Sequence, residues 1–358
     1  MKALLFAGGL ALILSLLGTK VAISFFSRRG YGQEIREDGP TSHHTKRGTP
    51  TMGGIVIIGA AVFGYLLAKL ITGQVPTASA WLLLFLFVGL GLVGFLDDFI
   101  KIVKQRSLGL RSKAKMIGQT IVALTFGYLA LSPMLEDENG VRPASEHISF
   151  VRDFDGWVVW TPLLLVFIWF LVTGFSNAVN LTDGLDGLAA GATTLVFGAF
   201  LLVNVWQYNQ SCSSDTALEA CYTVRDPLDL AILCAAIMGA TFGFLWWNAS
   251  PAQIFMGDTG SLALGGALAG LAVLTRTELL LVVIGGLFVL ETLSVMLQVS
   301  WFKITKGKRI FKMAPLHHHF EMLGWEQVTV VIRFWIIAGL FVAAGIGLFY
   351  GEWVATAG

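Results

Sequence analysis

Five aspartates stand at the ends of apolar runs, where their spacing suits the binding of a divalent cation. They are Asp97 and Asp98, directly after the apolar run 82–96, Asp183 and Asp186 in segment 177–187, and Asp258 in segment 255–261. Two carboxylates about 5 Å apart repel by roughly 3 kcal/mol at an effective dielectric constant of about 20, so a cation between them is favoured. Hard oxygen ligands without a cluster of His and Cys favour Mg²⁺ or Mn²⁺ over zinc.

Each of these aspartates, taken alone, has a second interpretation as the N-cap of a helix. The spacing of Asp183 and Asp186 places both carboxylates near each other on a turn or a first helical turn. All five aspartates are expected at helix ends close to membrane depth, where carboxylates are costly and usually mark function. Five of them on one side, beside a dense set of basic residues, favour a site over five independent caps.

Basic residues beside these acids suit a polyanionic ligand. Lys101 lies one helical turn after Asp97 and Asp98, so it can bind a phosphate or form a salt bridge with them. Carboxylate-bound metal together with lysine-bound phosphate is the usual way in which phosphoryl transfer is stabilised.

A histidine triplet and two flanking residues add further candidates. Residues 317–319 are all His and follow Pro315, which is expected to precede a short helix. Phosphate binding, or acid–base chemistry near neutral pH, suits the triplet better than a metal, because consecutive side chains rarely point one way. Phe255 and Asn248, on either side of the Asp258 turn, could stack on and hydrogen-bond a nucleobase, or could simply pack at a helix end.

The elements that must hold these residues are membrane-spanning helices. Only 13% of the 358 residues are charged and 55% are hydrophobic, whereas a soluble domain is about a quarter charged. This composition excludes a disordered chain, a basic nucleic-acid-binding domain and an ordinary cytosolic enzyme. Helices that cross a bilayer need about 20 mostly apolar residues, and ten segments qualify: 3–26, 52–72, 78–96, 116–135, 157–175, 188–206, 228–247, 262–275 (expected to begin nearer Gly257), 279–302 and 328–350. The sequence therefore predicts an all-α polytopic bundle of ten transmembrane helices.

The basic residues predict which way this bundle faces. Three loops, 27–51, 97–115 and 303–327, hold 16 of the 24 Lys and Arg residues. The positive-inside rule places these loops in the cytosol and both termini outside. Cys212 and Cys221 then fall in an outer loop, where either a disulfide or two free thiols is expected, and Cys234 lies inside a span.

Five segments together resemble the polyprenyl-phosphate N-acetylhexosamine-1-phosphate transferases, and most closely their bacterial phospho-N-acetylmuramoyl-pentapeptide transferase branch. The segments are 42–54 (SHHTKRGTPTMGG), 97–101 (DDFIK), 177–187 (NAVNLTDGLDG), 255–261 (FMGDTGS) and 314–321 (APLHHHFE). The full ordered set is specific and spans nearly the whole chain. The histidine triplet separates this branch from enzymes that use UDP-GlcNAc.

The resemblance implies a single domain, 1–358, in the bacterial plasma membrane. Its cytosolic catalytic loops would be 27–51, 97–115, 176–187, 248–261 and 303–327. It further implies Mg²⁺ dependence and a homodimer, with no nucleic-acid partner. The implied reaction transfers phospho-MurNAc-pentapeptide from UDP-MurNAc-pentapeptide to undecaprenyl phosphate, giving lipid I and UMP. Transfer from UDP-GlcNAc is the nearest alternative. A transporter is the alternative of a different class, but its charges would lie at mid-membrane rather than at one face.

The resemblance also assigns roles residue by residue. Asp258 is the expected Mg²⁺ ligand, Asp97 the base or nucleophile with Asp98 beside it, and His317 completes the catalytic set. The uridine side would be lined by Lys46, Asn180, Gly184, Leu185, Asp186, Asn248 and Phe255. Phosphates would be held by Lys101, Lys115 (preferred over Lys113), Asp183 and His318, with Gln298 nearby. We expect direct attack by the lipid phosphate on the nucleotide sugar, with a covalent intermediate on Asp97 as the rival.

Overall fold

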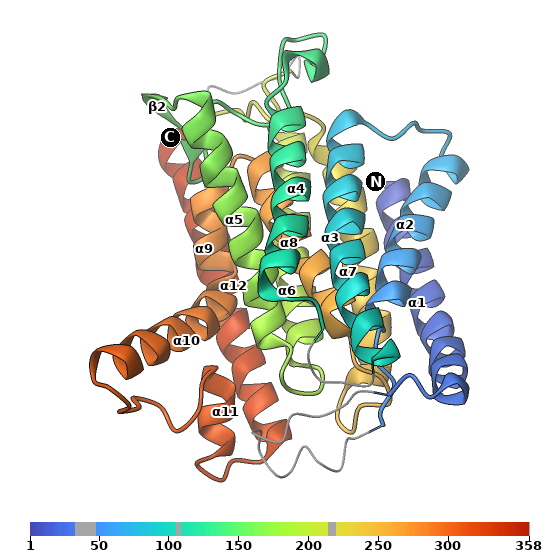
Figure 1. Ribbon diagram of the computed structural model, residues 1–358. Helices are drawn as coiled ribbons and strands as arrows, with labels where there is room; N and C mark the ends of the chain where they lie inside the picture. Colours follow the sequence, from blue (N-terminus) through green and yellow to red (C-terminus); the bar gives the residue numbers. More distant parts are fainter. Residues whose placement is uncertain (33–47, 105–108, 214–219, 358) are drawn as a thin grey trace.

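The computed structural model describes residues 1–32, 48–104, 109–213 and 220–357. Within these ranges the chain is mostly helical, and nine helices are long and apolar enough to cross a membrane. They are α1 (Lys2–Arg29), α2 (Gly54–Ile71), α3 (Ala78–Val103), α5 (Thr161–Thr182), α6 (Leu188–Asn209), α7 (Pro227–Asn248), α8 (Gly257–Leu274), α10 (Gly286–Ile304) and α12 (Gln327–Ala357). All of these helices except α10 run side by side as one bundle (Figure 1). A polytopic helical membrane protein is therefore confirmed.

The expected count of ten differs from these nine at one helix. The fourth expected span, 116–135, corresponds to α4 (Ser112–Ala130), which packs between α3 and α5 but is not among the nine. Its first turn carries Lys113 and Lys115, and these charges lower the apolar character of the helix. The count of ten spans stays a prediction.

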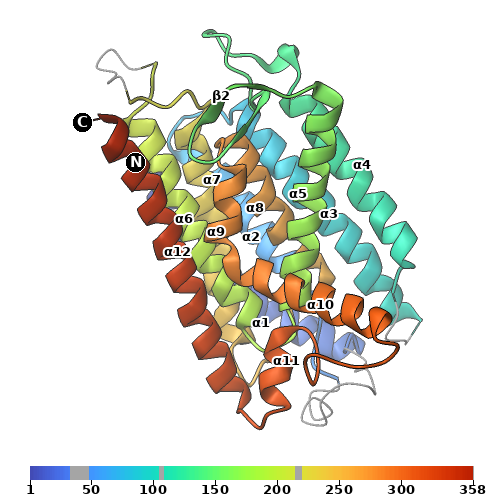
Figure 2. The ribbon, with the colours of Figure 1, turned by 90° about the vertical axis from the view of Figure 1, so that its left-hand side faces the viewer.

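The ninth expected span is two helices rather than one. α9 (Glu278–Ile284) ends at Gly285, and α10 then leaves the bundle at an angle (Figures 1 and 2). Glycines are frequent at sharp changes of helix direction. A Cβ at Gly285 would lie 2.8 Å from the Phe175 ring, so the break is also a point of close packing. The short α11 (Leu316–Glu321) follows Pro315 as expected.

α8 is the centre of the bundle and the element that positions the site. Every residue from Thr259 to Leu274 is buried, and α3 and α5 both pack against the helix. A Cβ on Gly94 of α3 would overlap the carbonyl oxygen of Asp258, so only glycine lets α3 approach the start of α8 this closely. This close approach brings the last turns of α3 beside the first turn of α8.

The opposite end of the bundle carries a small cap. Its parts are a 3₁₀ turn (η2, Pro133–Leu135) and an antiparallel hairpin of β1 (His147–Ser149) and β2 (Asp153–Val158). Cys212 and Cys221 form a disulfide there, while Cys234 is a buried free thiol. Both chain termini lie toward this same end (Figure 2). The side of the membrane on which they lie stays a prediction.

Candidate active site

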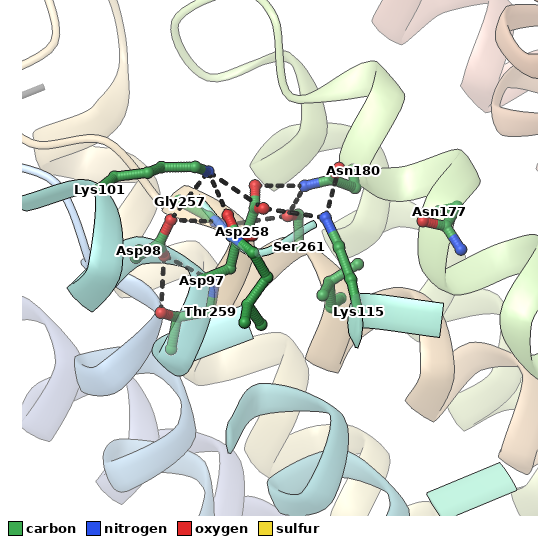
Figure 3. A network of polar contacts seen from close by, with 12 residues as sticks. Asp97, Asp98, Lys101, Lys115, Asn177, Asn180, Gly257, Asp258, Thr259 and Ser261 are labelled. Carbon is green, nitrogen blue, oxygen red and sulfur yellow. Dashed lines mark hydrogen bonds and ion pairs between the residues drawn. The ribbon is translucent and has the colours of Figure 1, made fainter. Parts of the chain in front are cut away.

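Three carboxylates from two helices meet at one end of the bundle (Figure 3). Asp97 and Asp98 come from the end of α3 and Asp258 from the first turn of α8. One oxygen of each lies within 4.8 Å of the others, so the three could hold a metal ion. Both carboxylates from α3 are buried, at 3% and 2% exposed. Three anions at this separation require nearby cations.

Asp98 anchors the start of α8. Its carboxylate accepts hydrogen bonds from the backbone N–H of Asp258 (3.2 Å), from the N–H of Thr259 (2.9 Å) and from the Thr259 hydroxyl (2.7 Å). An acid that accepts the free amides of a helix start stabilises the helix by about 0.3–2 kcal/mol. Asp98 therefore serves as a cap supplied by another helix. It also fixes the backbone of Asp258.

Asp97 is bound differently. One of its oxygens contacts Lys101 Nζ at 2.6 Å, and the other accepts the Leu110 N–H at 2.8 Å. Lys101 Nζ also lies 3.1 Å from Asp258 and 3.5 Å from Asp98. One ammonium group thus contacts all three carboxylates, in the position where the charge of a divalent cation would be needed.

Asp258 is held from a second side by residues of α4 and α5. Lys115 Nζ contacts Oδ2 at 2.9 Å, and Asn180 Nδ2 donates to Oδ1 at 2.8 Å. The Asn180 amide also donates to the Ser261 hydroxyl at 2.8 Å. Lys113 is exposed. Behind this layer, Gln119 donates to Ser176 and accepts from Asn177, which ties α4 to α5.

The turn 183–187 borders the same cluster. Burial, together with the carboxylates of Asp258, Asp98 and Asp186, raises the pKa of Asp183 to about 8. Leu185 is buried, and Gly184 packs against the imidazoles of α11. At neutral pH and without a bound cation, the Asp183 carboxyl is therefore mostly protonated.

Asp186 and Asn248 join this turn to the segment before α8. The Asp186 carboxylate accepts the N–H of Ala252 at 3.1 Å. Asn248 is 2% exposed; its side chain accepts the Gly187 N–H and donates to the Ile254 carbonyl. The backbone of Phe255 is bonded to Pro50 and Gly53 ahead of α2. These contacts fix the backbone of the segments that carry the residues predicted to line the uridine side.

The three histidines of the triplet contact three different partners. His317 is buried, with Nδ1 3.1 Å from Glu291 of α10. His318 Nδ1 lies 2.7 Å from Glu321, and His319 Nδ1 accepts the N–H of Lys312 at 3.1 Å. The three rings do not share one ligand position.

Gln298 holds the loop before α11. Its carbonyl oxygen accepts the N–H groups of Ile310 and Phe311 at 3.0 Å, and its amide donates to the Phe311 carbonyl at 3.1 Å. These hydrogen bonds of the Gln298 side chain are all to loop backbone. Lys46, the predicted substrate ligand in the basic loop 27–51, lies outside the described residues.

Two residues at the site were not singled out from the sequence. Thr259 donates its N–H and its hydroxyl to Asp98, which anchors the start of α8. A threonine after Asp258 has no sequence feature that would have marked it as functional. Glu291 did carry one, because an acid inside the apolar run 279–302 is costly unless it has a function.

The fold and the site together define a polytopic membrane enzyme whose clustered carboxylates and lysines suit phosphoryl transfer. Comparison with known proteins identifies the family. The pattern of glycosyl transferase family 4 matches residues 80–276, and a phospho-N-acetylmuramoyl-pentapeptide-transferase signature matches residues 46–58. The chain belongs to the phospho-N-acetylmuramoyl-pentapeptide-transferase family, as the resemblance of its motifs indicated.

Three relatives carrying that name support this assignment over full length. One from a Nocardioides species is 71% identical, covering 99% of this chain and 100% of the relative. One from Kineococcus radiotolerans is 62% identical, covering 100% of both. One from Cutibacterium acnes is 61% identical, covering 99% of both.

Proposed function

We propose that this protein transfers phospho-MurNAc-pentapeptide from UDP-MurNAc-pentapeptide to undecaprenyl phosphate, forming lipid I and UMP in the first membrane step of peptidoglycan synthesis. Family membership supports the choice of substrates. The structural observation that carries the proposal is the cluster of Asp97, Asp98 and Asp258 with Lys101 and Lys115. The family signature and the names of the relatives do not favour UDP-GlcNAc as the donor.

The donor set fits Mg²⁺. All three ligands are carboxylate oxygens, the kind of ligand that Mg²⁺ prefers, and Lys101 Nζ already lies among them as a substitute cation. Asp258, with Asp97 beside it, would hold the ion, since the Asp98 carboxylate is engaged by α8. When bound, the ion would neutralise charge on the pyrophosphate.

The side chains of this protein divide the remaining work. Asp97 orients the lipid phosphate for attack and can accept its proton, while Asp98 keeps the start of α8 in place. Lys115 and Asn180 set the direction of the Asp258 carboxylate. A phosphomonoester is largely ionised at neutral pH, because its second pKa is near 6. Orientation is therefore a larger part of the role of Asp97 than proton removal.

Further assignments in this proposal rest on the resemblance to the family. Lys46, Gly184, Leu185, Asp186, Asn248 and Phe255 border uridine, and Asp183, Gln298, His317 and His318 complete the phosphate side. The active enzyme is a homodimer in the bacterial plasma membrane, with the site facing the cytoplasm. The placement of the basic loops supports this orientation.

An assay of UMP release tests this function. Purified protein is incubated with Mg²⁺, a polyprenyl phosphate and each nucleotide sugar in turn. We expect UMP release only with UDP-MurNAc-pentapeptide. Release with UDP-GlcNAc alone would refute the proposed donor. Exchange of labelled UMP into the donor without any lipid acceptor would replace direct attack by a covalent step on Asp97.

A further inference from the structure

Two imidazoles converge on the turn 183–187, and each has a glutamate at its other nitrogen. A Cβ on Gly184 would overlap Nε2 of His317 and would lie 3.2 Å from Nε2 of His318. The Nδ1 atoms face the opposite way, that of His317 toward Glu291 and that of His318 toward Glu321. The two rings are 4.2 Å apart. The site therefore contains two Glu–His pairs, and the Nε2 atoms of both histidines face Gly184.

The His317 unit is closed off from solvent. Both His317 and Glu291 are 0% exposed. Nδ1 and the carboxylate are 3.1 Å apart, yet they do not form a hydrogen bond, and within the described chain neither ring nitrogen has a hydrogen-bond partner. A buried polar atom without a partner, aimed at a loop of the site, indicates a ligand that completes it. Hydrogen bonds in active sites commonly tighten only when substrate binds.

The break in the ninth span explains how Glu291 reaches this position. α10 starts at Gly286 and leaves the bundle axis, so its second turn passes beside α11. A carboxylate buried in an apolar helix is costly. The break at Gly285 and the buried position of Glu291 together place its carboxylate beside His317.

We propose that Glu291 is a positioning residue for the transfer reaction, holding Nδ1 of His317 so that Nε2 faces the phosphates bound near the turn 183–187. Glu321 does the same for His318. The hydrogen bond made by one imidazole nitrogen decides how the other can act. With Nδ1–H directed at the carboxylate, Nε2 serves as the acceptor of the neutral ring or the N–H donor of the imidazolium. This inference rests on the proposed function.

Kinetics of Glu291→Gln test the inference. The variant keeps the shape of the side chain and removes its charge. Loss of an outer-shell partner of this kind commonly costs about 10–100-fold in activity, and we expect kcat to fall by that factor while the donor KM changes less than about threefold. Glu278→Gln is the matched control: Glu278 is also buried, accepts the Ser149 N–H at 3.1 Å, and sits at the capped end of the bundle. Its kcat should stay at the wild-type value.

Three outcomes overturn the inference: wild-type kcat in Glu291→Gln, an equal loss in Glu278→Gln, or a loss confined to KM. Wild-type protein that does not turn over UDP-MurNAc-pentapeptide instead refutes the proposed function, so the two failures are distinguishable.

A second measurement does not depend on the folding of the glutamate variant. ¹⁵N NMR of histidine-labelled wild-type protein in lipid, with His317→Gln to assign the resonance, reports which ring nitrogen carries hydrogen. We expect hydrogen on Nδ1 of His317, alone or on both nitrogens. A neutral ring with hydrogen only on Nε2 would contradict the proposal.

Discussion

The substitution of Asp98 by Asn separates anchoring from chemistry at the paired aspartates. Asp98 accepts three hydrogen bonds at the start of α8, whereas Asp97 accepts none from that helix. In Asp98→Asn one acceptor oxygen becomes an NH₂ group facing N–H donors. Loss of the charge at the helix start costs up to about 2 kcal/mol, and one unpaired buried donor costs about 1–3 kcal/mol.

Asp97→Asn is the matched control, because it relieves the repulsion within the carboxylate cluster to a similar extent. The difference between the two variants therefore isolates the anchoring of α8. For a chain of this length, a difference of about 2 kcal/mol corresponds to roughly 3 °C in melting temperature. We expect Asp98→Asn to melt lower than Asp97→Asn by about that amount.

Thermal unfolding of both variants in detergent, beside their rates of UMP release, makes the comparison. Both variants should be strongly impaired in turnover, Asp97→Asn without loss of stability. Equal melting temperatures, or a lower one for Asp97→Asn, would refute the division of roles between the two carboxylates.

Three further predictions follow from the charges and cross-links of the structure. Lys101→Met should bind Mn²⁺ roughly tenfold more tightly, about 1.4 kcal/mol, because the ammonium that contacts all three carboxylates is gone. Calorimetry measures this affinity. An unchanged affinity would show that the lysine does not occupy the position of the ion. The pKa of Asp183 is raised to about 8, so the folded state retains a proton that the unfolded chain loses near pH 4. Metal-free protein should therefore lose stability as pH rises from about 4 to 8 and Asp183→Asn should flatten this slope, which melting curves across that range would measure. Replacing Cys212 and Cys221 by Ser removes a cross-link over nine residues and should cost about 2–3 kcal/mol of unfolding free energy, with UMP release unaffected; lost activity in a stably folded variant would contradict a purely structural role.

The motif residues could be selected from the sequence, because each motif is a short-range pattern. Apolar length located the helices, and the run of small residues after Gly257 correctly placed the start of α8. The proximity of Asp97, Asp98 and Asp258 could not be predicted in this way, because it arises from tertiary packing. Their meeting depends on the packing of α3 against α8 through Gly94, which a single sequence does not specify.

The division of roles between neighbouring residues was the least predictable feature. Asp97 and Asp98 are adjacent and chemically identical, and only the direction of each side chain shows which one holds α8. The break at Gly285 is similar: hydropathy continues through it, and the close packing of Gly285 against the Phe175 ring is seen only in the fold. The purpose of Glu291 became visible only when α11 was placed beside α10.

The formation of lipid I by Asp258→Asn at saturating Mg²⁺ tests the central claim most directly. Asp258 is the carboxylate that Lys101, Lys115 and Asn180 all contact. We predict that the variant folds, with a melting temperature near that of the wild type, and forms no measurable lipid I. Turnover near the wild-type rate would contradict the assignment of this carboxylate cluster as the active site.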